Sequence, residues 1–179
     1  MADNQDGETR QRIHTRSIDV TGYLRDDGLF DIEARLVDAK GIDYPLSTGL
    51  RRAGEPVHDM RVCLTVDRQL TIHAVEARMG AMPYPGACDE IVPDYQGLVG
   101  LNLMHGFRRA LREQLGGVAG CSHLSELLMS VPTAAIQTLA SFVTDNQETR
   151  RKPFQLDRCH ALDTRGETVR HHYPRWYRK

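Results

Sequence analysis

The chain has 179 residues and a formal net charge of −1, with 40% hydrophobic, 26% charged and 6% aromatic residues. This size and balance are typical of one globular domain with a buried core. The near-neutral charge and the scarcity of aromatic side chains argue against a nucleic-acid-binding protein. No stretch approaches the roughly 18 apolar residues of a membrane span, and residues 1–16 do not resemble a signal peptide, so we expect a cytoplasmic protein without membrane contact.

The first half of the chain shows the two-residue alternation of β-strands. Residues 1–11 lack apolar periodicity, and we expect a disordered tail there. Four alternating runs, separated by short turns and one longer connection, predict two β-hairpins: residues 18–24, 29–37, 60–66 and 70–78. Residues 80–88, which are rich in Gly and Pro, end the sheet region as a loop.

The second half changes to helical spacing. Residues 98–115 predict a first helix that stops at Gly116 and Gly117. Ser122 can cap a second helix, which extends to Val143 and is kinked or broken at Pro132. Strands followed by helices favour an α+β fold, with the helices packed on one face of an antiparallel sheet. We therefore expect a single α+β domain over residues 12–144, followed by a linker and a C-terminal extension, residues 145–179, that docks on the domain.

The pair His58 and Asp59 is the first candidate for chemistry. It is predicted to lie in a loop just before a strand, where an imidazole and a carboxylate can bind a metal or move a proton. The alternative is that both side chains make only local hydrogen bonds.

The four cysteines differ in their predicted surroundings. In a reducing compartment they should be thiols or metal ligands rather than disulfides. Cys63 lies inside a strand and is expected to be structural, whereas Cys88 lies in an accessible loop. Cys121 follows three glycines and begins a helix, where the helix dipole favours the thiolate. Cys159 stands beside His160, and this pair could add ligands or be an ordinary part of the tail.

His123 and Glu126 follow Cys121 on the second predicted helix. They are three residues apart and therefore share one helix face. Together with Cys121 they favour a functional site, although a helix entry with a buried cysteine remains the alternative. Both residues are candidates to carry protons, as is Asp59.

Several segments resemble a known family. The residues that carry the resemblance are 25–34 (RDDGLFDIEA), 54–60 (GEPVHDM), 120–127 (GCSHLSEL) and 159–162 (CHAL). They are similar to a bacterial family described only as domain of unknown function 2889. This resemblance covers nearly the whole chain and implies no reaction.

A more distant resemblance, over residues 54–140, is to NifU/SufU-like scaffold proteins of iron–sulfur cluster assembly. It implies a NifU/SufU-like fold in which His58 or Asp59, Cys88 and Cys121 meet at one end of the sheet. Such a mixed set of ligands suits a divalent metal, zinc first and iron or manganese as alternatives, with a fourth position open to water or substrate. His58 stands where that family has a cysteine, and thiolates suit iron–sulfur clusters better than imidazole does.

Three functions remain open at this point. The first is a small metal-dependent enzyme of the lyase, hydratase or hydrolase type that acts on a small aromatic or acyl metabolite. The second is a metal or iron–sulfur carrier that serves a protein partner. The third is a non-catalytic α+β module with buried cysteines. The C-terminal Trp176 and Tyr177 could dock on the domain or on a second subunit, so a homo-oligomer also stays open.

Overall fold

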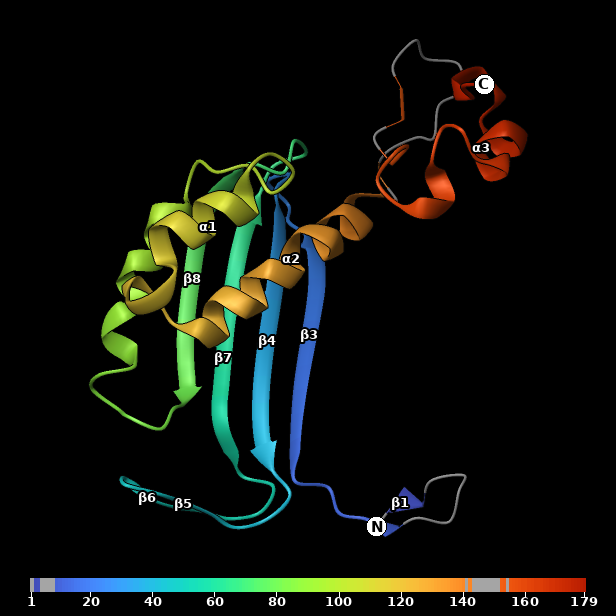
Figure 1. The fold of residues 1–179 in the computed structure, drawn as a ribbon. Helices are drawn as coiled ribbons and strands as arrows, with labels where there is room; N and C mark the ends of the chain where they lie inside the picture. Colours follow the sequence, from blue (N-terminus) through green and yellow to red (C-terminus); the bar gives the residue numbers. More distant parts are fainter. Residues whose placement is uncertain (1, 4–8, 141, 143–151, 154) are drawn as a thin grey trace. The chain divides into compact units, whose positions relative to one another are not determined.

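The protein is divided into two compact units in the computed structural model, Met1–Leu139 and Ala140–Lys179, here called the body and the C-terminal unit. The structure describes residues 2–3, 9–140, 142, 152–153 and 155–179 (Figure 1). The boundary predicted at residue 144 lies outside the described residues, and the docking of residues 145–179 stays a prediction. The described parts of the predicted N-terminal tail include two short paired strands, β1 (Ala2–Asp3) and β2 (Thr9–Arg10).

A four-stranded antiparallel sheet with the order β3-β4-β7-β8 forms the centre of the body. Its strands are β3 (His14–Leu24), β4 (Phe30–Lys40), β7 (Pro56–Val66) and β8 (Ile72–Ala81). The predicted α+β class and antiparallel sheet are therefore confirmed. Strand β7 begins before the predicted position because its first residues pair with the end of β4. His58 and Asp59 are consequently strand residues and not loop residues.

Alternation along the strands separates the two faces of the sheet. On β4, Phe30, Ile32, Ala34 and Leu36 are buried, whereas Asp31, Glu33 and Arg35, which alternate with them, point to the opposite face. We call the buried side the core face and the other side the open face. Asp38 has the same parity as Leu36, so its carboxylate points to the core face.

Two helices complete the body, α1 (Phe107–Leu115) and α2 (Ser122–Ala140). Figure 1 shows both lying across the same face of the sheet. Their buried side chains join those of the core face in one hydrophobic cluster. Helix α2 approaches β3 closely at Gly22, where a Cβ atom would lie 2.0 Å from the hydroxyl oxygen of Thr138. Any larger residue at this position would collide with α2.

The first predicted helix forms only in its second half. Residues 99–106 instead make turns, because Gly100 and Gly106 adopt positive φ angles of 86° and 74°. Asn102 lies in this non-helical segment, and its side chain donates a hydrogen bond to the backbone carbonyl of Gln69 at 2.7 Å. A 3₁₀ segment, η1 (Asp89–Leu98), and a short one, η2 (Gly117–Ala119), flank α1.

The second predicted helix continues through Pro132 without a break and is described as far as Ala140. The end predicted at Val143 lies outside the described residues. A small hairpin of β5 (Tyr44–Leu46) and β6 (Gly49–Arg51) is inserted between β4 and β7. The C-terminal unit contains η3 (His160–Leu162), α3 (Glu167–His172) and η4 (Pro174–Trp176) around the buried Leu156 and Val169.

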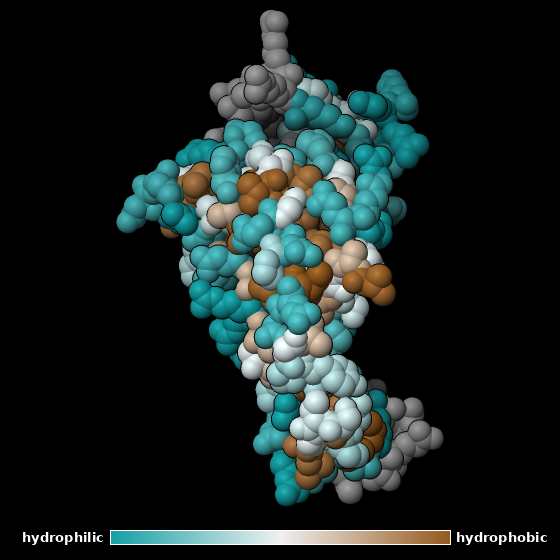
Figure 2. Space-filling view, turned by 90° about the vertical axis from the view of Figure 1, so that its left-hand side faces the viewer, coloured by the Kyte–Doolittle hydropathy of each residue, from teal (hydrophilic) through white to brown (hydrophobic). Residues whose placement is uncertain are grey.

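Apolar and polar side chains are mixed on the surface beside β8, η1 and α1. Figure 2 views the molecule from this side and shows brown apolar groups interspersed with teal hydrophilic ones. Among the described residues, none of the helices has the length and apolarity that crossing a membrane requires.

Candidate functional site

A buried carboxylate, Asp38, is the centre of a polar cluster at the end of the core face. Its side chain is only 4% exposed. An isolated charge in that position would be costly, so its partners matter. Arg16 donates from Nε to Oδ1 and from Nη2 to Oδ2, each at 2.7 Å. This two-pronged pair satisfies both carboxylate oxygens and fixes the plane of the carboxylate.

The register of the sheet brings the first members together. Asp38 lies directly opposite Arg16 on β3 and directly opposite His58 on β7. Residues opposite each other in an antiparallel pair point to the same face, so all three side chains share the core face. Nδ1 of His58 lies 3.1 Å from Oδ2 of Asp38. His14, at the start of β3, places Nε2 3.3 Å from Oδ1.

Helix α2 supplies His123 from the other layer. Its Nε2 lies 3.5 Å from Oδ2 of Asp38, and its ring stacks on that of His58 with centroids 3.7 Å apart and an angle of 28°. The opposite ring nitrogen, Nδ1, lies 3.4 Å from the hydroxyl of Ser122 and 4.0 Å from the thiol of Cys121. One buried carboxylate oxygen thus faces two imidazole rings.

A buried tyrosine holds the start of α2 in place. Tyr95 of η1 is fully buried, and its hydroxyl accepts a hydrogen bond from the backbone N–H of Cys121 at 3.0 Å. The same hydroxyl donates to the carbonyl of Cys121 at 3.2 Å. Tyr95 therefore fixes the backbone two residues before His123.

Burial decides the protonation state of the two imidazoles. It lowers the pKa of His58, and the neighbouring His123 lowers it further, against the raising effect of Asp38. Burial also lowers the pKa of His123. For Asp38, burial acts to raise the pKa, but hydrogen bonding and charge from Arg16 outweigh it and hold the pKa below its usual value. At neutral pH His58 and His123 are therefore neutral imidazoles, and Asp38 is a carboxylate.

This combination can ligate a metal ion. Asp38, His58 and His123 each offer one ligand atom, and these atoms all lie within 4.8 Å of one another. Two neutral imidazoles and one carboxylate are the donors used by non-haem iron sites and by many catalytic zinc sites. Such a set leaves coordination positions free for water or substrate.

A cavity of about 530 Å³ adjoins the cluster. His58 and His123 line it, so both imidazoles border the cavity. Among the described residues, the rest of the lining is made mainly of apolar residue types and includes no Lys or Arg. It comprises Met60, Pro83, Tyr84, Ala87, Cys88, Glu90, Ile91, Val118, Gly120, Cys121 and Ser122. A small, largely uncharged molecule fits this lining.

The structure places the predicted site residues in different surroundings. His58 and His123 belong to the cluster. Cys88 and Cys121 line the adjoining cavity but are not among the three grouped ligands. Glu126 lies on the same side of α2 as His123, and it accepts a hydrogen bond from Nη1 of Arg16.

Asp59 lies on the opposite face of the sheet from His58. Successive residues of a strand point to opposite faces, so His58 faces the core and its neighbour faces the open side. Arg35 donates from Nε and Nη2 to the two carboxylate oxygens of Asp59 at 2.8 Å each. Asp59 is therefore engaged in a pair on the open face, away from the cluster.

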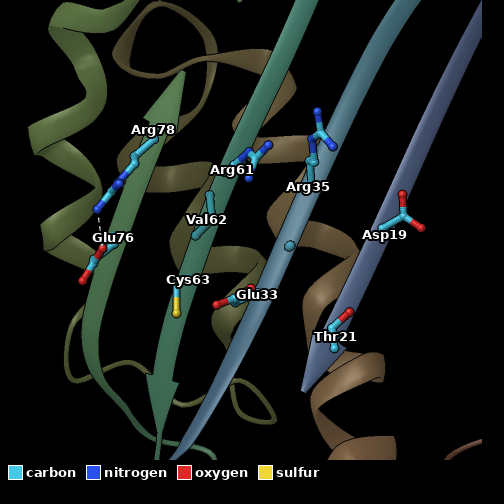
Figure 3. A pocket seen from close by; sticks show the side chains of 10 residues that line it. Asp19, Thr21, Glu33, Arg35, Arg61, Val62, Cys63, Glu76 and Arg78 are labelled. Carbon is cyan, nitrogen blue, oxygen red and sulfur yellow. Dashed lines mark hydrogen bonds and ion pairs between the residues drawn. The ribbon is translucent and has the colours of Figure 1, made fainter. Parts of the chain in front are cut away.

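Figure 3 shows this open face, where three strands present Arg35, Arg61 and Arg78 in neighbouring positions. Cys63 lies between Glu33 and Glu76, and burial together with nearby carboxylates raises its pKa to about 11. The thiol stays protonated, which agrees with the structural role expected for it. Cys159 and His160 lie in the C-terminal unit, where both are exposed.

Three members of the cluster, His14, Arg16 and Asp38, were not identified from the sequence. A usable signal exists, because Asp38 follows Phe30, Ile32, Ala34 and Leu36 at the same parity. An acidic residue that continues a buried row needs a buried partner. Arg16 has the matching parity on the preceding strand, ahead of Ile18 and Val20.

Comparison with known proteins identifies the family of the chain. No curated protein and no solved structure matches the chain, so the resemblance to NifU/SufU-like proteins stays a prediction. A family model described as "Protein of unknown function (DUF2889)" matches residues 14–137, which is more than half of the chain. The match includes Arg16, Asp38, His58 and His123, and the chain therefore belongs to the DUF2889 family.

Proposed function

We propose that this protein binds one divalent transition-metal ion between Asp38, His58 and His123 and uses it in catalysis. The ion would polarise a substrate oxygen or activate a bound water, as in a metal-dependent lyase, hydratase or hydrolase. The observation that carries the proposal is the convergence of three ligand atoms within 4.8 Å on a buried carboxylate. Lowered pKa values at both imidazoles add support, because a metal ligand must be deprotonated.

The cavity supports a small-molecule substrate. Among the described residues, its lining offers Met60, Tyr84 and Ile91 as apolar contacts and Glu90 as the only carboxylate. An aromatic or acyl metabolite with one oxygen directed at the ion matches these features. Glu90 is then the best-placed side chain to carry a proton, in place of Asp59 and Glu126.

The ligand types favour a single ion over an iron–sulfur cluster. Clusters are held mainly by cysteine thiolates, whereas imidazole and carboxylate suit Zn²⁺, Fe²⁺ or Mn²⁺. Cys88 and Cys121 border the cavity, but they stand outside the group of three. Zinc remains the first choice for the metal.

Metal titration of matched variants tests the proposal. The protein, purified without a metal-binding tag, is stripped with a chelator and titrated with Zn²⁺ and Co²⁺ by calorimetry and visible absorption. We expect about one ion per chain, and its loss in His58→Ala and His123→Ala. Asp38→Asn should also lose the ion, whereas Asp59→Asn, which changes the same type of group on the open face, should keep it.

Folding of each variant is checked by circular dichroism, since Asp38→Asn leaves Arg16 without its buried partner. Failure of the folded wild-type chain to bind either ion would refute the metal site. Binding that survives in both histidine variants would place the ion elsewhere.

A further inference from the structure

Arg16 joins two carboxylates that come from different layers of the body. It donates through Nε and Nη2 to Asp38 on β4 and through Nη1 to Glu126 on α2. These bonds, together with the charges of both carboxylates, raise the pKa of Arg16 well above its already high value. The guanidinium is therefore charged at every relevant pH, and it lies next to the carboxylate that a cation would need.

The charges of the three groups show what Glu126 contributes. Arg16 and Asp38 alone would sum to zero, and a fixed positive charge beside Asp38 would repel an incoming cation. Glu126 restores a net charge of −1 to the set.

The spacing of His123 and Glu126 fits this arrangement. Residues three apart on a helix project from the same face. His123 contacts Asp38, and Glu126 contacts the guanidinium of Arg16, which is bonded to Asp38. Docking of one helix face thus supplies a metal ligand and a counter-charge together.

We propose that Glu126 is a positioning residue that neutralises Arg16, so that Arg16 can orient Asp38 without cancelling the negative charge that attracts the metal ion. This inference rests on the proposed function, because it concerns the affinity of the same site. Glu126 acts through Arg16 and touches neither the ion nor the substrate. Its side chain is 55% exposed, so its replacement by Gln should leave the fold intact.

The test is a double-mutant cycle on the affinity for Zn²⁺ and Co²⁺, with Glu126→Gln, Arg16→Gln and the double variant. Removing a group that bonds a metal ligand typically weakens metal binding 10- to 100-fold. Glu126 bonds Arg16 and not a ligand, so we expect a rise in Kd near the lower end of this range, about tenfold, for Glu126→Gln. In the Arg16→Gln background the same change should alter Kd less than about twofold, because the charge to be neutralised is gone. Glu76→Gln is the matched control, since it removes an exposed Glu–Arg pair with a 3.2 Å contact on the open face (Figure 3).

An unchanged Kd in Glu126→Gln would overturn the inference. An equal loss in both backgrounds would overturn it as well, since Glu126 would then act independently of Arg16. If Arg16→Gln abolishes binding, the variant Glu126→Asp is used in place of the cycle. Glu126→Asp keeps the negative charge, so we expect a Kd within about threefold of wild type. A Kd as weak as that of Glu126→Gln would count against the inference. Absence of binding in the wild type refutes the proposed function itself, and binding that ignores Glu126 refutes only this inference.

Discussion

Replacing Tyr95 by Phe should destabilise the body through the loss of one hydroxyl. The aromatic ring remains and continues to fill its fully buried position. The backbone N–H of Cys121, however, loses the oxygen that accepts its hydrogen bond at 3.0 Å. The carbonyl of Cys121 keeps a partner, because it also accepts from the N–H of Ser125 at 2.9 Å.

The expected loss of stability comes from one group, the backbone N–H of Cys121, which loses its hydrogen-bond acceptor. A buried donor without an acceptor costs about 1–3 kcal/mol. A change of 1 kcal/mol shifts the melting temperature by about 2–4 °C in a domain of this size, so Tm should fall by about 2–12 °C. The start of α2 should also become less well fixed, and since His123 lies two residues beyond Cys121, metal affinity should weaken in the same variant.

Urea denaturation followed by circular dichroism measures the free energy of unfolding, and a thermal scan measures Tm. Tyr23→Phe is the control, because that tyrosine is 49% exposed on β3 and should change stability by less than about 0.5 kcal/mol. A Tyr95→Phe protein as stable as the control would show that the hydroxyl does not hold the start of α2.

Three further predictions concern packing, pH and catalysis. Gly22→Ala should destabilise the body by about 1–3 kcal/mol in urea denaturation, because its Cβ would lie 2.0 Å from the hydroxyl oxygen of Thr138; wild-type stability would mean that α2 can move away. The lowered pKa values of His58 and His123 mean that the unfolded chain takes up protons first as the pH falls. The stability of the metal-free protein should therefore be full above about pH 6.5 and decrease below it, and equal unfolding free energies at pH 7.5 and 5.5 would contradict this. Once a substrate is found, Glu90→Gln should lower kcat about 100-fold or more while metal binding stays intact, and unchanged turnover would remove Glu90 as the proton carrier.

Alternation of apolar and polar residues was sufficient to predict the four strands of the sheet, because one face is buried and the other is not. The same pattern does not mark where a strand begins when the terminal residues are polar, as at His58 and Asp59. The face of each residue follows from parity once the strand is known. Asp59 was predicted to lie in a loop, where parity gives no information, so its place on the open face of the sheet was not foreseen.

The helical period was ambiguous over residues 98–106. Leu98, Leu101 and Met104 have helical spacing, yet Gly100 and Gly106 take positive φ angles and Asn102 bonds to Gln69. Tertiary contacts outweighed periodicity there. His123 and Glu126 were correctly placed on one helix face, but their partners, Asp38 and Arg16, come from strands 85 to 110 residues away. No local pattern contains such pairings.

The candidate ligands come from three separate elements, β4, β7 and α2, and this has a consequence for how the protein folds. The unfolded chain has no such site, so an ion that binds there would bind only after the sheet is in register and the helix has docked. Binding restricted to the native state adds RT ln(1 + [metal]/Kd) to stability, about 4 kcal/mol when the free ion is at 1,000 times Kd. Metal supply would then affect how long each newly made chain survives proteolysis, because only a correctly folded chain would bind the ion and be stabilised by it.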